Sequence, residues 1–203
     1  MREVKADWCV CTIPASILSQ LDVQVSDTMK AAIRAVGYST QVKIGLEFKR
    51  RFWEEDDHIY GGHSFTSQTI GLVSYPNNNM FGKGPAVLLG AFASDAAGLQ
   101  LSGMTPEQRI ETALAQGEVF HPQYRKEFMN GVAVAWSRVP WMMGCTSRWT
   151  DENRAQHYQN LVAMDGRLVL AGEHASYYGG WMEGSLLSSL DAITRLHKAA
   201  QEA

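Results

Sequence analysis

The sequence predicts a mixed α/β (α+β) fold, and three of its features carry that expectation. Residues 39–53 alternate apolar and polar side chains, which is typical of a strand with one buried face. Residues 105–120 combine a Thr-Pro start with early acidic residues, which is typical of a capped helix. Residues 168–171 form a short apolar run that leads toward a helix beginning near residue 183. Strands and helices therefore intermix along the chain, as in sheets that are covered by helices.

Length, charge and composition narrow the class of protein. The 203 residues suffice for one large or two small domains, and 45% of them are hydrophobic, which is enough to build a core. The formal net charge of −3 gives no electrostatic reason to expect nucleic acid or an anionic membrane as a partner. No apolar run predicts a membrane span, and the first residues lack the apolar core of a signal peptide.

The three cysteines are too few, and odd in number, for a disulfide framework, which favours reduced thiols as in the cytoplasm. Cys9 and Cys11 share one face of a predicted strand, where we expect buried structural thiols. A metal site there would lack nearby histidines. His58 and His63 follow an acidic run and are expected in a solvated loop, so no metal site is predicted.

The first part of the chain is expected to alternate strands and helices. Residues 8–14 predict a short buried strand, and residues 14–21 predict a turn with a short helix. Residues 26–37 predict a helix that is capped at its start and stopped by Gly37. In the strand at 39–53, the side chains expected to be buried are Val42, Ile44, Leu46 and Phe48.

The second part continues the mixed order. Residues 54–76 hold one or two strands broken by Gly61-Gly62, and residues 76–85 form a turn-rich loop. The remaining expected elements are a strand at 86–94, the helix at 105–120, a strand at 132–139, a polar connector with helical character at 150–161, a strand at 168–171 and a helix at about 183–201.

The segment GEHASYYGGWMEG, residues 172–184, connects a predicted strand to the N-terminus of a predicted helix. Free N–H groups and the helix dipole attract negative charge there, and glycines allow a flat ligand to approach the backbone. Tyr177, Tyr178 and Trp181 are candidate aromatic walls, and Glu173 is a candidate acceptor for ligand hydroxyl groups. The pattern predicts a cofactor site, although a tight strand–helix turn with aromatic packing would use the same residues.

Residues 168–193, LVLAGEHASYYGGWMEGSLLSSLDAI, resemble the C-terminal flavin-binding segment of the flavin-dependent amine oxidase family. That family includes monoamine, polyamine and L-amino acid oxidases. The resemblance implies FAD as cofactor, with Glu173 at its ribityl-diphosphate region and Met182 at the pyrimidine end of the flavin. It also implies that Trp181 is catalytic, as one wall of an aromatic cage before the flavin. The residues that the resemblance assigns to cofactor binding are Gly172, Glu173, Gly180, Trp181, Met182 and Glu183.

A second stretch supports the same family. Residues 6–18, and then 37–53, are similar to the passage from the FAD domain into the substrate domain. Lys43 matches a lysine that, in many members, holds a water beside the flavin and assists the reaction with O2. A positive charge there favours the reduced oxygen species, which would make Lys43 catalytic. The alternative is a lysine on the exposed face of a strand.

Residues 130–149 resemble the family's approach to the active site, though less closely. Trp149 and Tyr178 are the expected lining of a substrate cavity. Cys145 lies near the position where some members attach FAD covalently. Because the aromatic residue that usually follows is absent, noncovalent FAD is the favoured interpretation.

The resemblance covers nearly the whole chain, but only the C-terminal half of a two-domain flavin amine oxidase. It implies a mixed-sheet substrate domain at 16–148, between FAD-domain segments at 1–15 and 149–203. The GxGxxG fingerprint of the nucleotide-binding half is absent from the sequence. We therefore expect a partner half that carries it, in the same protein or in a second chain.

The resemblance implies an FAD-dependent oxidase of small-molecule amines or L-amino acids. Hydride would pass from the substrate to the flavin, O2 would become hydrogen peroxide, and water would hydrolyse the imine. An apolar cavity would help by favouring the neutral amine. The alternative is a non-catalytic truncated or assembly subunit that does not bind FAD without its N-terminal partner.

Overall fold

The computed structural model describes residues 3–203, which form two compact units. The first unit contains the chain up to Ser39 together with Pro140–Ala203, and the second contains Thr40–Val139. The chain thus leaves the first unit and later returns to it. The boundaries predicted at residues 15/16 and 148/149 separate segments that bind FAD from a domain that binds substrate. This division by function stays a prediction.

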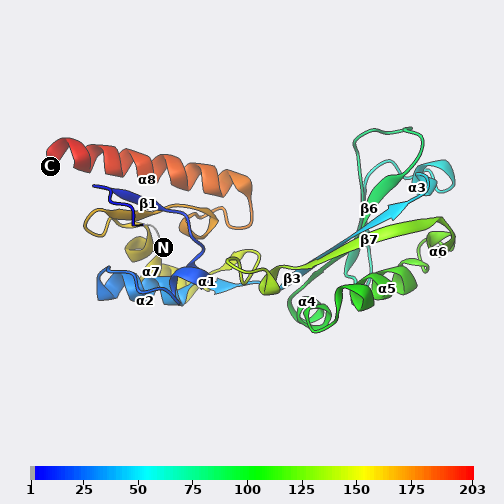
Figure 1. Ribbon diagram of the computed structural model, residues 1–203, viewed down its shortest axis with the longest axis horizontal. Helices are drawn as coiled ribbons and strands as arrows, with labels where there is room; N and C mark the ends of the chain where they lie inside the picture. The colour runs from blue at the N-terminus through cyan, green and yellow to red at the C-terminus, as the bar shows by residue number, and fades with distance from the viewer. Residues whose placement is uncertain (1–2) are drawn as a thin grey trace. The chain divides into compact units, whose positions relative to one another are not determined.

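The first unit is built on a two-stranded parallel sheet with helices on both faces (Figure 1). β1 (Cys9–Cys11) pairs with β9 (Leu168–Leu170). α8 (Met182–Glu202) packs on one face, and α2 (Asp27–Ala35) and α7 (Asp151–Val162) cover the other. β9 is therefore buried from both sides, as is usual for parallel strands.

The start of α2 confirms the predicted cap, because the Ser26 hydroxyl accepts the backbone N–H of Met29. The helix ends at Ala35, two residues before the predicted glycine stop at Gly37. Gly37 instead begins β2 (Gly37–Tyr38), which pairs antiparallel with β8 (Ser147–Arg148). Gly37 thus lies just beyond the helix and takes part in a pairing with a strand more than 100 residues away. The short helix α1 (Ala15–Leu18) follows Pro14, as expected.

The prediction that Cys9 and Cys11 are both buried is wrong. Cys9 is exposed and Cys11 is half-buried. Within residues 3–203, β1 pairs with β9 along one edge, and its other edge has no strand partner. Its side chains are therefore less covered than those of an inner strand would be. Partial burial still raises the pKa of the Cys11 thiol.

The second unit contains a five-stranded antiparallel sheet in the order β4-β5-β6-β3-β7. β3 (Gln41–Phe48) lies between β6 (Ala86–Ser94) and β7 (Phe128–Ala135). The predicted alternation along β3 is confirmed, because every second side chain is fully buried in the core. These side chains are Val42, Ile44, Leu46 and Phe48.

The helices α4 (Asp95–Ser102) and α5 (Pro106–Gly117) lie against one side of this sheet (Figure 1). α5 begins as predicted, with a capping box in which Thr105 and Gln108 exchange hydrogen bonds. The other elements of the unit are α3 (Phe52–Glu55), β4 (Gly62–Phe65), β5 (Leu72–Tyr75) and α6 (Tyr124–Glu127).

Several boundaries in the second unit differ from the predictions. The strand predicted at 39–53 ends at Phe48. The glycine pair does not break a strand, since β4 begins at Gly62. The strand predicted at 132–139 is β7, which begins at Phe128 and gives way to a 3-10 helix at Trp136–Arg138. The early part of β7 contains Asn130 and Gly131, residue types that are uncommon in strands. These residues are nevertheless part of the strand, because they pair with β3.

The polar segment predicted at 150–161 is the helix α7, and Thr150 caps it by accepting the N–H of Asn153. The strand and helix predicted at 168–171 and about 183–201 are confirmed as β9 and α8. Across residues 3–203, no helix is both long and apolar enough to cross a membrane. The same residues contain no cluster of three or more His, Cys, Asp or Glu side chains that could hold a metal ion.

Candidate cofactor site

The connection from β9 to α8 is fixed by Ser188, which lies on α8. Its hydroxyl accepts the N–H of Gly172 at 2.9 Å and lies 2.8 Å from the carbonyl oxygen of Gly172, to which it can donate. Gly172 has φ 132° and ψ −178°, a conformation that other residues adopt only at high cost. A Cβ atom there would also lie 2.9 Å from Cε1 of His174. The chain therefore needs glycine at the point where it leaves the strand.

Glu173 joins this connection to β8. Its carboxylate accepts the backbone N–H of Ser147 at 3.0 Å, the Ser147 hydroxyl at 2.9 Å, and the N–H of Gly180 at 2.6 Å. Hydrogen bonds to an ionised acceptor are stronger than neutral ones, so Glu173 holds the glycine turn in place. Oε1 lies near all of these donors, whereas Oε2 contacts only the Ser147 N–H. Oε2 therefore keeps acceptor capacity for a ligand.

The turn before α8 requires glycine and leaves the helix start accessible. Gly180 has φ 80°, and a Cβ atom on Gly184 would collide with the carbonyl oxygen of Tyr178. Trp181 is the N-cap residue of α8 and makes no side-chain capping hydrogen bond. Trp181 and Met182 are 73% and 85% exposed, and Glu183 is also exposed. The first N–H groups of this helix therefore receive no acceptor from a capping side chain.

A pocket of about 370 Å³ lies beside this connection, within the first unit. Polar side chains and the first turns of a 21-residue helix meet there. Such a helix terminus favours a ligand with negative charge or with acceptor atoms. The lining includes Tyr38, Cys145, Gly172, Glu173, His174 and Ser185.

Two groups at this pocket have shifted pKa values. Burial lowers the pKa of His174, which is only 4% exposed, so its imidazole is neutral at pH 7. Its Nε2 atom is buried without a hydrogen-bond partner in the described chain, which is uncommon in a folded protein. Burial raises the pKa of Tyr38 to about 12, so its hydroxyl, which accepts the N–H of Ala15, stays protonated.

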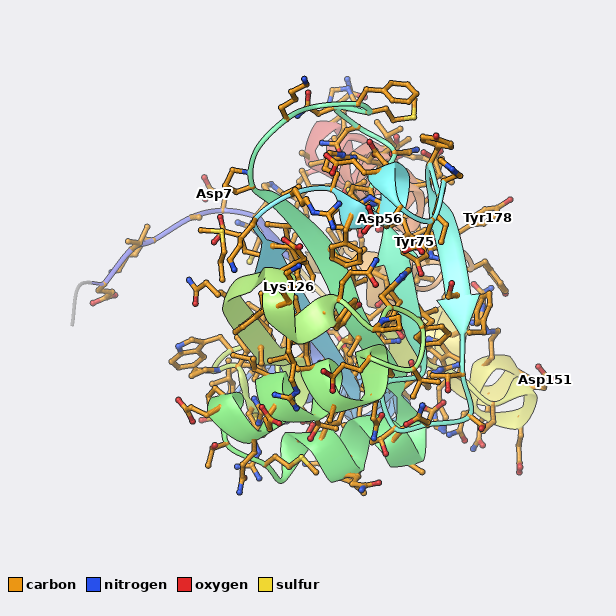
Figure 2. All side chains as sticks on the ribbon, turned by 90° about the vertical axis from the view of Figure 1, so that its right-hand side faces the viewer. Asp7, Asp56, Tyr75, Lys126, Asp151 and Tyr178 are labelled. Carbon is orange, nitrogen blue, oxygen red and sulfur yellow. The ribbon has the colours of Figure 1, made fainter. Side chains whose placement is uncertain are left out.

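The structure places the other predicted residues elsewhere. Lys43 belongs to the second unit, where it is half-buried on β3 with Nζ 4.9 Å from the centre of the Phe92 ring. Trp149 packs edge-on against Tyr158, with ring centres 6.0 Å apart. Tyr178 is 61% exposed and its side chain extends outward (Figure 2). In residues 3–203, neither Trp149 nor Tyr178 lines the pocket beside Glu173. Of the residues predicted to bind the cofactor, Gly172 and Glu173 line it, whereas those of the turn and the first residues of α8 do not: Gly180, Trp181, Met182 and Glu183.

Reasoning from the sequence missed the serines of this site. Ser147 anchors Glu173, Ser188 anchors Gly172, and Ser185 and Ser189 line the pocket. The sequence does contain one indication of the helical serines. Ser185, Ser188 and Ser189, at i, i+3 and i+4, form a polar stripe on a helix that is otherwise rich in leucine. Ser147 gave no such signal, because its partner lies 26 residues away.

Comparison with known proteins identifies the family of this chain. The profile of the family described as flavin containing amine oxidoreductase matches residues 1–196. The chain therefore belongs to the flavin-containing amine oxidoreductases, a family of flavoprotein oxidoreductases.

Relatives with curated descriptions are named as L-amino acid oxidases. A putative L-amino-acid oxidase, YobN, from Bacillus subtilis is 32% identical over 91% of this chain and 40% of its own length. An L-amino-acid oxidase from Siganus canaliculatus is 30% identical over 98% of this chain and 38% of its own length. The flavin-dependent L-tryptophan oxidase RebO of Lentzea aerocolonigenes is 31% identical over 95% of this chain and 42% of its own length. The chain thus spans about two fifths of these relatives.

Solved structures give the same fold. Cyclohexylamine oxidase from Brevibacterium oxydans superposes with a TM-score of 0.83 at 16% identity, covering 98% of this chain and 44% of its own. Putrescine oxidase bound to putrescine superposes with a TM-score of 0.79 at 16% identity, and the match covers 95% of this chain and 43% of the putrescine oxidase chain. The mixed α/β architecture is therefore that of part of a flavin amine oxidase.

The residues at the pocket fit a flavin. A flavin ring system presents carbonyl and nitrogen acceptors, which match the uncapped N–H groups at the start of α8, outside the pocket lining that Ser185 and Ser189 supply. Its ribityl hydroxyls need acceptors, and Oε2 of Glu173 has that capacity. The unpaired Nε2 of His174 also shows that the described residues leave a polar atom at this pocket unsatisfied.

Proposed function

We propose that this chain provides the C-terminal flavin-binding segment and the substrate unit of an FAD-dependent oxidase of L-amino acids or amines. FAD would accept hydride from the substrate and pass electrons to O2, which yields hydrogen peroxide and an imine that water hydrolyses. The observation that carries the proposal is the connection from β9 to α8, where Glu173 holds a glycine turn beside an uncapped helix start.

The chain's own residues would bind and orient the cofactor. Gly172 and Gly180 allow close approach of the backbone, and Oε2 of Glu173 would accept a ribityl hydroxyl. The first N–H groups of α8, at Met182 and Glu183, would stabilise negative charge on the reduced ring. The pocket has room for part of the cofactor, and the remainder would require the nucleotide-binding half of the protein.

The proposed substrate wall is aromatic. Trp181 would form it, and its 73% exposure leaves its ring available to a ligand. Tyr178 is a second candidate for the same reason. Trp149 is a weaker one, because its ring already packs against Tyr158 and faces Arg154. An apolar wall would favour the neutral amine, which is the form that can give up hydride.

Among substrates, we favour L-amino acids over simple amines. The relatives with the higher sequence identity are named as L-amino-acid oxidases or, for RebO, as an L-tryptophan oxidase. The two amine oxidases named above are structural neighbours at 16% identity, and similarity at that level reflects the fold and not the substrate. Lys43 would assist the reaction with O2 through its positive charge.

The first experiment is an absorption spectrum of the purified chain, recorded alone and after addition of FAD, and again after acid precipitation. Visible flavin bands that leave with the supernatant would support noncovalent binding. Bands that stay with the pellet would make Cys145, which lines the pocket, the attachment residue. A sample that stays colourless with added FAD would favour the alternative, a non-catalytic assembly subunit that needs its N-terminal partner.

A further inference from the structure

A second pocket of the first unit, of about 320 Å³, lies where α7, α8 and the residues after β9 meet. Its volume is at the lower end of the range of about 300–1,000 Å³ that is usual for small-molecule sites. Its walls are aromatic and aliphatic, and two residues of opposite charge, Asp191 and Arg195, also line it. It shares no lining residue with the pocket beside Glu173.

The two pockets lie on different flanks of α8. Leu187, Asp191 and Arg195 follow one another at intervals of four residues, so they share one face of the helix. Ser185 and Ser189, which line the pocket beside Glu173, each lie two residues earlier, about 200° away around the helix. A ligand in one pocket therefore leaves the other pocket free.

Tyr177 gives this pocket an aromatic wall that is held in position but still accessible. Its side chain is 61% exposed, yet its ring centre lies 4.3 Å from that of the buried Tyr158, and the Arg154 guanidinium lies 5.0 Å from the same ring centre. Tyr158 is fixed in turn, because its hydroxyl donates to the carbonyl oxygen of Ala175 at 3.2 Å. A ligand ring that stacks on Tyr177 therefore has little side-chain freedom to remove.

The charged part of the pocket is also positioned by contacts within the unit. The Arg195 guanidinium donates to the carbonyl oxygen of Val162 on α7 and to the carboxylate of Asp191. A guanidinium has five N–H donors, so Arg195 keeps donors for a ligand carboxylate, and Asp191 keeps acceptor capacity for a ligand ammonium. Burial raises the pKa of Tyr158, and the charges of Asp191 and Arg195 also act on it, so the charges and the aromatic wall are close together.

We propose that this pocket is a second ligand site, which binds an α-amino acid with an aromatic side chain as its zwitterion. The ligand carboxylate pairs with Arg195, the ligand ammonium pairs with Asp191, and the ligand ring stacks on Tyr177. A ligand with a carboxylate alone meets repulsion from Asp191, and one with an ammonium alone meets repulsion from Arg195. The inference goes beyond the proposed function, because binding at this pocket requires neither FAD nor O2.

The test is a ligand-observed NMR titration of the full 203-residue chain, without added FAD, and the probe is L-phenylalanine. We expect saturable binding. Three related compounds each lack one recognised group: phenylpropionate lacks the ammonium, phenethylamine lacks the carboxylate, and L-alanine lacks the ring. Each of them should bind at least fivefold more weakly than L-phenylalanine.

Variants locate the binding at this pocket. Arg195→Gln and Tyr177→Ala should each raise the Kd of L-phenylalanine at least fivefold. Their matched controls, which should leave the Kd unchanged, are Arg167→Gln at a 65% exposed side chain of the first unit and Tyr60→Ala at a 43% exposed residue of the second. Circular dichroism verifies that the variants are folded. Leu187→Trp, which fills the pocket from a partly exposed position on α8, replaces them if they are not and should have the same effect.

The proposal is overturned if L-phenylalanine does not bind saturably, or if its Kd is unchanged in Arg195→Gln and Tyr177→Ala. Equal affinities for L-phenylalanine and phenylpropionate would also overturn it, because Asp191 would then contribute nothing. Binding that is lost in Trp181→Ala but kept in Leu187→Trp would assign the ligand to the proposed substrate wall instead. The result does not depend on flavin, so a colourless chain that binds L-phenylalanine at this pocket supports the inference even if the proposed function fails.

Discussion

The carboxylate of Glu173 accepts the backbone N–H of Gly180 at 2.6 Å, seven residues further along the chain. The same carboxylate holds both the N–H and the hydroxyl of Ser147. Glu173 therefore has a structural role in this chain besides any contact with a cofactor. It determines the position of the turn that carries Trp181 and the start of α8.

Replacing Glu173 should weaken the first unit. Glu173→Ala leaves the Ser147 and Gly180 N–H groups without their charged acceptor, so we expect the free energy of unfolding to fall by about 2 kcal/mol. Urea unfolding followed by circular dichroism measures the change. Glu202→Ala, at an exposed position near the end of α8, is the matched control and should have little effect. An unchanged stability in Glu173→Ala would mean that these hydrogen bonds contribute nothing in solution.

The Ser188 hydroxyl should matter more than that of its neighbour Ser189. Ser188→Ala removes the contacts with the N–H and carbonyl of Gly172, and we expect a loss of about 1–2 kcal/mol in unfolding free energy. Ser189→Ala removes only a hydrogen bond to a carbonyl within the same helix, so its effect should stay below about 0.5 kcal/mol. Equal effects of the two substitutions in urea unfolding would contradict this account.

Two glycines should differ in how they tolerate alanine. Gly62 has φ 83° and open space at its Cβ position, so Gly62→Ala should cost about 1–2 kcal/mol from backbone strain alone. Gly172 has a less accessible conformation, and its Cβ would press on the buried His174 ring. We expect Gly172→Ala to cost at least about 1 kcal/mol more than Gly62→Ala. Thermal unfolding of both variants provides the comparison, and the reverse order would show that the connection after β9 can relax.

Local patterns predicted much of the fold, because the relevant physics is local. The alternation in β3 and the Thr-Pro start of α5 were both visible in the sequence. Gly37 had the appearance of a helix stop, but it pairs with β8, and nothing near it in the sequence indicated that pairing. The same limit applies to the site. The glycine turn and Glu173 stood out, whereas Ser147 became part of the site only through the folding of distant segments.

Stability of the second unit should fall in mild acid through His121. This side chain is 2% exposed, with Nδ1 2.8 Å from Asp57 and Nε2 2.7 Å from the Tyr75 hydroxyl. Burial lowers the pKa of His121, and the hydrogen bond and charge of Asp57 oppose that shift without cancelling it. The unfolded imidazole, with its ordinary pKa near 6.5, therefore binds a proton at a higher pH than the folded one.

The direction of the pH effect on stability follows from this difference between the unfolded-state and folded-state pKa of His121. Well above pH 6.5 both states are neutral at His121, and the contribution to stability is constant. As the pH falls below that value the unfolded state takes up more protons, so the free energy of unfolding decreases. Urea unfolding at pH 7.5 and at about pH 5.5 should show lower stability in acid, and His121→Gln should reduce the difference. A pH dependence that is identical in His121→Gln would assign the effect to other groups.

Lys43 provides the sharpest test of the proposed oxidase chemistry. If its positive charge assists the reaction with O2, Lys43→Met in a flavin-containing complex should slow reoxidation by O2 at least tenfold. Anaerobic reduction by substrate should change much less, because that step does not require this charge. Lys49→Met is the matched control, because Lys49 lies beyond the end of β3 and its Nζ donates a hydrogen bond to the carbonyl oxygen of Lys126. Stopped-flow absorbance measures both half-reactions separately. If Lys43→Met slows neither step, the half-buried position of Lys43 over the Phe92 ring is a packing feature of the sheet and not part of the oxidase mechanism.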